Sequence, residues 1–465
     1  MSLRRLNFDA DALVAVAVKA SGASEGNEIA VIAEGSYNRV FRINFADGKD
    51  VIARCTQVHA KIWLPSEVAT MDFVRSRLGP RVPKVLAWDA SSDNAVGCEY
   101  IIMEKCVGPT LHNRVDANPN SFRHIYDVAE LMSNLASIPF SQYGSIYYKE
   151  DMKTNYLDDS GLVRAWNDVF IEAGALICLL TVVHGRIYSP ISAQNQVGAR
   201  HTAEQHIALL QKWATIFPAV LPQSIYCMPT LSHPDLHADN ICVTDADPMS
   251  VTSIIDWQSA SVLPLFESEM PKFLDHQIFG SQFKYISTSD NLEQPVMPDN
   301  FNTLGNEERS QATAEFLQAW PKHAYLKHLS QLHPRLADHE VAQLPQIEVL
   351  RRAIYHSAHS WSQGLPALEQ MLMVIKYAYG GTFPIHKDYP AAGIFSGEDL
   401  EQYSADMDEL IEEQEHEAAV MELLQEDGIC VSQDGGVAEQ DFEAALKKAE
   451  DIRSRCIAHG STERG

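Results

Sequence analysis

The sequence has few basic residues for its length. Its 465 residues include 36 Lys and Arg against 62 Asp and Glu, a formal net charge of −26. Such an excess of negative charge is repelled by phosphate backbones, so nucleic acid is not expected as a partner. Half of the excess lies in residues 398–427, which contain 13 Asp and Glu and no Lys or Arg. We predict that this stretch is an acidic helix with a solvated face.

Long apolar runs are also missing. The longest strongly apolar run, residues 175–183, is far shorter than the roughly 20 residues that a membrane-spanning helix needs. No membrane span and no signal peptide are therefore predicted. The N-terminus has two arginines followed at once by Asp9 and Asp11, which is a poor pattern for a mitochondrial presequence. These features predict an intracellular protein and favour the cytoplasm.

Paired cysteines are absent as well. None of the eight cysteines forms a C-x-x-C pair, which excludes the common zinc and dithiol motifs. An apolar content of 46% over this length is enough for sizeable cores without disulfides. We therefore expect free thiols and a reducing compartment.

The chemistry-bearing residues that are present concentrate between residues 231 and 257. Asp235 and Asn240 lie five positions apart, and a short β-type run, residues 241–243, follows. Turn residues then lead into a second β-type run, residues 251–255, which ends at Asp256. A hairpin of this kind is expected to bring Asp235, Asn240 and Asp256 to one end.

This trio matches the requirements of phosphoryl transfer. One carboxylate accepts the proton of the substrate hydroxyl, while an amide oxygen and a second carboxylate hold magnesium against the phosphates. We assign Asp235 as the base and Asn240 and Asp256 as Mg²⁺ ligands, with His233 ordering the loop.

Two other interpretations of the same stretch remain open. Asp and Asn are common in turns, so the segment is also compatible with a polar loop that carries no chemistry. Alternatively, His233, Asp235, His237 and Asp239 alternate, and on a strand they would share one face, as the ligands of a metal hydrolase would. Pro234, in the middle of that stretch, argues against a central strand.

The N-terminal part reads as a small antiparallel sheet. Strands are expected at residues 28–33, 40–45 and 51–55, with an Asp-Gly hairpin turn between the second and third. Gly35 lies between the first two strands, where its backbone permits close approach to a ligand. Amides near Ser36 and Asn38 are then candidates for binding phosphate oxygens.

The third strand carries the cation Arg54. Protein kinases have a lysine here that binds phosphate and pairs with a helix glutamate. Glu67, in a helix expected to start near Pro65, is the candidate partner of Arg54. Arginine keeps the charge but is bulkier and not interchangeable with lysine. Helices are also expected over residues 7–26, 121–137, 306–331 and 339–379 and from 202 onward.

The motifs resemble the aminoglycoside phosphotransferase branch of the kinase-like superfamily. Pro234 stands where protein kinases have Arg, and Trp257-Gln258 stand in place of Phe-Gly. Further segments resemble a fungal subgroup, the altered inheritance of mitochondria protein 9 family. These segments are residues 35–41, 51–54, 66–71, 99–104, 144–148, 256–258 and 263–266.

The resemblance implies a two-lobed, kinase-like α+β fold. It places an extension at 1–26, a small antiparallel lobe at 27–106, a mainly helical lobe at 107–397 and an acidic tail at 398–465. It also implies ATP in the cleft, with adenine bound by the Glu104 carbonyl and the Cys106 amide. The subgroup's name implies a mitochondrial link that the N-terminus does not support.

We therefore predict an ATP- and Mg²⁺-dependent phosphotransferase whose partners are a nucleotide and a small molecule with an acceptor hydroxyl. The alternative is a pseudokinase that binds nucleotide as a regulatory or scaffold protein. The retained Asp235, Asn240 and Asp256 argue against that alternative, while Arg54 and the glycine-poor loop leave it open.

Overall fold

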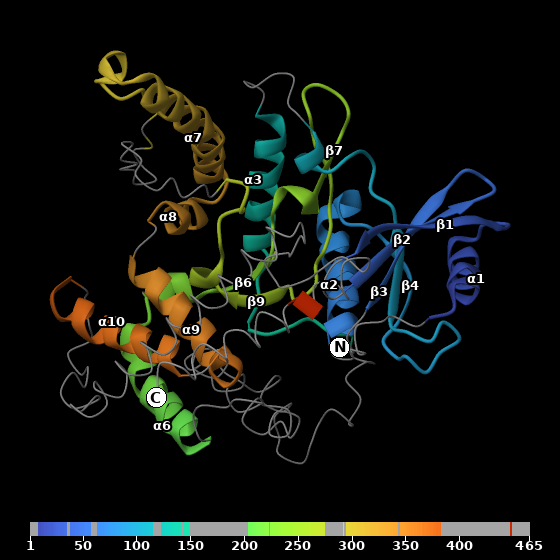
Figure 1. Ribbon diagram of the computed structural model, residues 1–465, viewed down its shortest axis with the longest axis horizontal. Coiled ribbons are helices and arrows are strands. Elements are labelled where there is room, and N and C mark those ends of the chain that lie inside the picture. Colours follow the sequence, from blue (N-terminus) through green and yellow to red (C-terminus); the bar gives the residue numbers. More distant parts are fainter. Residues whose placement is uncertain are drawn as a thin grey trace.

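The computed structural model describes most of the chain in seven segments (Figure 1). They are residues 8–34, 38–56, 63–114, 122–148, 203–274, 292–342 and 345–382, without positions 142, 223, 293 and 364 and with the pair 447–448 in addition. The acidic stretch 398–427 and the predicted boundary at 398 lie outside these residues.

An antiparallel sheet forms the N-terminal lobe. Its strand order is β1-β2-β3-β5-β4, and every neighbouring pair is antiparallel. The predicted strands are therefore confirmed, each longer by one or two residues at an end. Their bounds are β1 Gly26–Glu34, β2 Asn38–Phe45, β3 Asp50–Thr56, β4 Val85–Asp89 and β5 Tyr100–Glu104.

Two helices cover the two faces of this sheet. Helix α1 (Ala10–Ser21) begins at Asp9, whose carboxylate accepts a 2.9 Å hydrogen bond from the Ala12 amide. Its buried residues pack with Phe41, Ile43 and other residues of one face. Helix α2 (Trp63–Leu78) packs on the opposite face, where Ile101 is buried. Successive residues of a strand point to opposite faces, so Arg54, the register partner of Ile101, faces α2.

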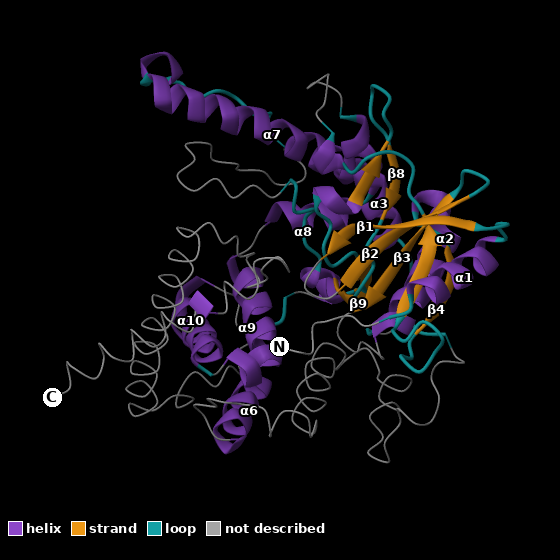
Figure 2. Cartoon of the chain, turned by 45° about the vertical axis from the view of Figure 1, so that its right-hand side comes forward, coloured by secondary structure: helices purple, strands orange, loops and turns teal. Residues whose placement is uncertain are grey.

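The C-terminal lobe is mainly helical, and its core surrounds two short two-stranded sheets. Strands β6 and β9 pair antiparallel, and so do β7 and β8. Helix α3 and part of α7 pack around these strands in one core, whereas α6, α9 and α10 share a second core (Figure 2). The strands are β6 Pro229–Ser232, β7 Ile241–Val243, β8 Val251–Ile254 and β9 Ser261–Pro264. The helices are α3 Arg123–Ala136, α6 Ala203–Val220, α7 Asn306–Leu332, α8 Pro334–Ala342, α9 Pro345–Gln363 and α10 Pro366–Thr382.

The region expected to be helical over residues 339–379 is divided into α8, α9 and α10. Each of these helices begins at a proline. Proline has no amide hydrogen and disfavours helical geometry in the residue before it, so it starts a new helix more readily than it continues an old one. Within the described residues no helix combines the length and the apolar character needed to span a membrane.

The chain crosses between the lobes immediately after β5. Gly108 lies there with φ +86°, and a Cβ at this position would come within 1.9 Å of the Val243 carbonyl oxygen. The Val243 amide donates to Pro109 O at 2.9 Å. The crossing is therefore packed directly against β7, and a side chain at residue 108 is excluded.

We expect Gly108→Ala to destabilise the protein more than a matched glycine substitution elsewhere. The new methyl group adds a clash to the backbone strain, so the free energy of unfolding should fall by about 2–4 kcal/mol. Gly48→Ala is the control, because Gly48 has a similar φ of +82° but open space around it, and it should cost about 1 kcal/mol. Urea unfolding of both variants measures the difference. Equal losses would contradict the close approach to Val243.

Candidate active site

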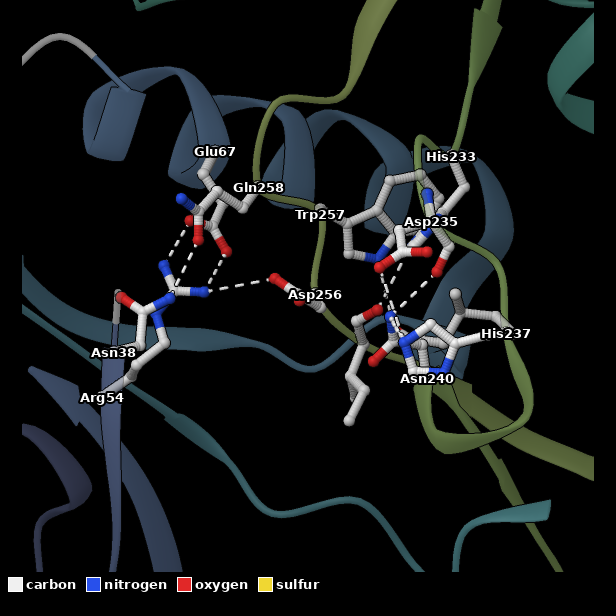
Figure 3. Close-up of polar contacts among 12 residues, drawn as sticks. Asn38, Arg54, Glu67, His233, Asp235, His237, Asn240, Asp256, Trp257 and Gln258 are labelled. Carbon is white, nitrogen blue, oxygen red and sulfur yellow. Dashed lines mark hydrogen bonds and ion pairs between the residues drawn. The ribbon is translucent and has the colours of Figure 1, made fainter. Parts of the chain in front are cut away.

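The loop between β6 and β7 carries Asp235 and Asn240 at the centre of the site (Figure 3). The Asn240 Nδ2 donates to the backbone oxygen of Asp235 at 2.9 Å. The Asn240 backbone carbonyl accepts from the Ile255 amide at 3.0 Å, which ties the loop to the end of β8. The spacing of five residues thus closes a small ring that fixes the Asn240 side chain relative to the backbone of Asp235.

Asp256 follows β8 in a left-handed backbone conformation, with φ 63°. A residue other than glycine adopts this conformation at a cost of about 1–2 kcal/mol. The fully buried Trp257 holds the turn in place, because its Nε1 donates to Ile254 O at 3.1 Å. The Asp256 carboxylate remains 45% exposed and lies 3.5 Å from Arg54. The strained turn at the end of β8 thus directs this carboxylate toward the small lobe.

His233 orders the loop, as predicted. Its Nδ1 accepts from the Asp235 amide at 3.2 Å, so its Nε2 carries the hydrogen and donates to Ile255 O at 3.0 Å. The ring packs edge-on against Trp257, with centroids 4.8 Å apart. Burial lowers the pKa of His233 to about 4. The imidazole is therefore neutral at pH 7, in the one tautomer that its partners fix.

Arg54 and Glu67 form the predicted ion pair. Arg54 Nη1 lies 2.8 Å from Glu67 Oε1, and Nη2 bonds to Oε2, which makes the pair bidentate. Both side chains are buried. Burial acts to lower the pKa of Arg54, but the charge of Glu67 outweighs burial and the pKa is raised. The Nε atom of Arg54 is buried without a hydrogen-bond partner among the described residues.

A second polar contact joins the lobes beside this pair. Asn38 Nδ2 in β2 donates to Gln258 Oε1 at 2.9 Å, and Asn38 Oδ1 is buried without a partner in the described part of the chain. Figure 3 shows Asn38 and Gln258 beside Arg54 and Glu67, with Asp256 between this group and the loop of Asp235. Gly35 and Ser36 lie outside the described residues, so the phosphate-loop prediction there stays a prediction.

Glu104 and Cys106 lie at the junction of the lobes. The Glu104 carboxylate accepts from the Lys84 amide and from Arg75, both at 3.1 Å. A hydrogen bond from the Cys242 thiol lowers the pKa of Cys106 to about 7. Cys242 belongs to β7, so this contact holds the junction against the hairpin that separates Asn240 from Asp256. The predicted contacts of Glu104 and Cys106 with adenine stay predictions.

The arrangement required by the metal-hydrolase interpretation is not observed. Residues 233–240 form turns and a short 3₁₀ helix instead of a strand, so the four alternating side chains do not share a face. Both ring nitrogens of His233 are already hydrogen-bonded within the protein. No group of three or more His, Cys, Asp or Glu in the described segments is arranged to hold a metal.

The sequence did not predict the contacts that Lys272, His237 and Gln258 make with the site residues. Lys272 Nζ contacts Asp235 Oδ1 at 2.7 Å, and His237 Nε2 lies 3.5 Å from Oδ2 of the same carboxylate. Gln258 directly follows the Asp-Trp pair, so its place in the motif was a usable signal. Lys272 is 37 positions from Asp235, and no local pattern marks it.

Residues 28–267, which contain the sheet, the catalytic loop and Asp256, match the model of the phosphotransferase enzyme family. The chain belongs to this family. The predicted kinase-like α+β fold, with a small antiparallel lobe and a mainly helical lobe, is confirmed.

The chain is also similar to individual relatives and to solved structures. The chain is 26% identical to a subtelomeric hrmA-associated cluster protein of Aspergillus fumigatus, over 92% of this chain and 93% of that protein. It is 32% identical to altered inheritance of mitochondria protein 9, mitochondrial, of Yarrowia lipolytica, over 61% of this chain and 56% of that protein. The predicted resemblance to that group is confirmed. The ternary complex of APH(2'')-IIa with streptomycin and ATP is similar with a TM-score of 0.39 and 13% identity, over 79% of this chain and 97% of that one.

The buried His233 predicts a specific loss of stability in acid. Its folded-state pKa, about 4, lies below the ordinary 6.5, so the unfolded chain binds the proton first as the pH falls. The burial of His233 should therefore not change the free energy of unfolding above pH 6.5. Between pH 6.5 and 4 it should lower that free energy by about 1.4 kcal/mol for each pH unit. His233→Gln should flatten this part of the pH–stability curve, and His112→Gln, at an exposed position, should not. Identical slopes in all three proteins would contradict the prediction.

A double-mutant cycle should detect the Arg54–Glu67 pair. Arg54→Met and Glu67→Leu each leave one buried charge unpaired and should lower the free energy of unfolding by about 3–5 kcal/mol. The double variant should lose much less than the sum, because no unpaired charge remains. Arg352→Met is the control, because Arg352 pairs with Glu348 at the surface. This substitution should change the free energy of unfolding by less than about 1 kcal/mol. Additive losses for Arg54 and Glu67 would show that the two charges do not interact.

Proposed function

We propose that the protein is an ATP- and Mg²⁺-dependent phosphotransferase that transfers the γ-phosphoryl group of ATP to a hydroxyl of a small molecule. The observation that carries the proposal is the position of Arg54. It joins the buried Glu67 of the small lobe to Asp256 of the large lobe, which brings a fixed cation and an acid to the same place. Membership of the phosphotransferase family supports this reaction class.

The unpartnered Nε atom of Arg54 is suited to bind a phosphate oxygen. Glu67 takes one hydrogen from each terminal nitrogen of Arg54, and the buried Nε is left without a partner in the described residues. A buried donor in that state costs free energy unless a ligand satisfies it. A phosphate oxygen is a suitable acceptor for a guanidinium. We therefore assign Arg54 to phosphate binding, with Glu67 fixing its orientation.

The donor atoms of Asn240 and Asp256 suit magnesium, which prefers oxygen ligands. Because Asn240 Nδ2 donates to Asp235 O, its amide oxygen is the atom that would bind the ion, together with the exposed Asp256 carboxylate. When bound, the ion would neutralise charge on the phosphates. The Glu104 carbonyl and Cys106 amide, at the junction of the lobes, are proposed to bind the adenine.

Asp235 is proposed as the base. Its carboxylate is 45% exposed and therefore accessible to an acceptor hydroxyl. Its backbone is held by His233 and Asn240, so the carboxylate is placed before the acceptor arrives. Pre-placement of the base reduces the entropy cost of the reaction. The reaction is placed inside the cell, where ATP is present.

Two substitutions separate the base from the metal ligand. Asp235→Asn should keep MgATP affinity within a few-fold and abolish ATP turnover, because it removes the proton acceptor while leaving the phosphate site intact. Asp256→Asn should instead weaken MgATP binding, because it removes a charged ligand of the ion. Isothermal calorimetry measures affinity, and a radiolabelled ATP assay with sugars, amino alcohols, polyols and nucleosides as acceptors measures turnover.

Asp299→Asn, at an exposed position of the large lobe, is the matched control and should change neither quantity. Absence of MgATP binding by the unmodified protein would overturn the proposed function. Binding without transfer to any acceptor or to water, unaffected by Asp235→Asn, would favour the regulatory nucleotide-binding role instead.

A further inference from the structure

Lys272 is fixed to the catalytic loop by its own backbone. Its amide donates to Leu236 O at 3.0 Å, one residue after the base. Leu236 is buried, and so are Met270 and Leu274 on either side of Lys272, all in the core of the large lobe. The Leu274 amide also bonds to Pro271 O at 2.8 Å, which closes a turn around Lys272. The starting point of the lysine side chain is therefore set by packing.

The ammonium group reaches the base directly. Lys272 Nζ lies 2.7 Å from Asp235 Oδ1, with the lysine 53% and the aspartate 45% exposed. His237 Nε2 approaches the second oxygen, Oδ2, at 3.5 Å. His237 Nε2 also lies 3.2 Å from Asn240 Nδ2, and His237 Nδ1 accepts from the Asp239 amide at 3.2 Å. The ammonium of Lys272 is therefore the cationic donor beside the carboxylate.

The charges around Asp235 explain why a cation is needed. Asp256 and Asp235 both act on the ring of His233, so the two acids share one neighbourhood. Asp239 is close as well, on the far side of His237. ATP would add the negative charge of its phosphates. Like charges repel one another, so a positive charge beside the Asp235 carboxylate is needed to hold it in place.

An exposed Lys–Asp pair contributes little to stability, so the placement of Lys272 is better explained by the base than by folding. We propose that Lys272 is a positioning residue that holds the Asp235 carboxylate in its orientation toward the acceptor while the phosphoryl group is transferred. This inference rests on the proposed function, and it names a residue outside the motif that supplies the base.

The transfer that Lys272 supports is balanced as follows. The acceptor oxygen forms a bond to the γ-phosphorus while the bond from that phosphorus to the bridging oxygen of ADP breaks. ADP leaves with the electron pair of the broken bond. The hydroxyl proton passes to Asp235, whose carboxylate Lys272 holds at Oδ1 and whose amide donates to His233.

The experiment compares Lys272→Ala, Lys272→Arg and Lys49→Ala. Lys49 also pairs with an aspartate, Asp47, at 2.9 Å, but on a turn of the small lobe, so it is a matched control. MgATP affinity is measured by calorimetry, and ATP turnover is measured in the presence of Mg²⁺. The assay uses the best acceptor from the screen, or water if no acceptor is better.

Lys272→Ala should lower the maximal turnover rate by about tenfold or more, with MgATP affinity unchanged within a few-fold. The loss should appear in the rate and not in the affinity, because a carboxylate without its cation is no longer held in one orientation. Lys272→Arg should restore most of the rate, and Lys49→Ala should match the unmodified protein.

An unchanged turnover rate in Lys272→Ala, or a loss that Lys272→Arg does not restore, would overturn this inference and leave the proposed function standing. A loss confined to MgATP affinity would overturn it too, because it would show a nucleotide contact instead of support for the base. Absence of MgATP binding by the unmodified protein is a different result. It would overturn the proposed function itself, and the role of Lys272 with it.

Discussion

The burial of Arg54 is the constraint on which the site depends. A guanidinium inside a protein needs a charged partner, because an isolated buried charge is very costly. Glu67 meets this need with a bidentate contact, which fixes α2 against β3 and directs the guanidinium toward the large lobe. The further contact with Asp256 then sets the distance between the lobes at this point. An interaction that stabilises the small lobe thus also places the cation that we propose binds phosphate.

The large lobe meets this cation with a rigid loop that carries Asp235, the proposed base. The Asp235–Asn240 ring, the single tautomer of His233 and the buried Trp257 hold one another. These contacts offset the strain of the left-handed Asp256. Their hydrogen bonds are 2.9–3.2 Å long and at least partly buried, so the loop is ordered before any ligand arrives. Such preorganisation is the main contribution that a protein makes to phosphoryl transfer, in which little covalent chemistry is left to its side chains.

Asp235, the proposed base, is contacted by residues from outside its motif. Asp235 and His237 come from the catalytic loop, while Lys272 comes from the segment after η7 (Leu265–Glu267). That segment is anchored by buried apolar neighbours and by a backbone bond to Leu236. Packing in the core of the large lobe therefore sets the position of the positive charge beside Asp235, the proposed base. The junction of the lobes is coupled to the same hairpin through Gly108 and Val243.

The sequence by itself determined the strands of the small lobe, the pairing of Arg54 with Glu67 and the grouping of Asp235, Asn240 and Asp256. The strands and the trio follow from local periodicity, turn residues and short spacings, and the Arg54–Glu67 pair follows from the resemblance of its strand and helix to those of kinases. The tertiary structure decided the contact of Asn38 with Gln258, 220 positions away, and that of Lys272 with Asp235. It also decided the left-handed turn at Asp256 and the exclusion of a side chain at Gly108. No spacing encodes these features, because each depends on where separately folded segments meet when their apolar faces are buried together.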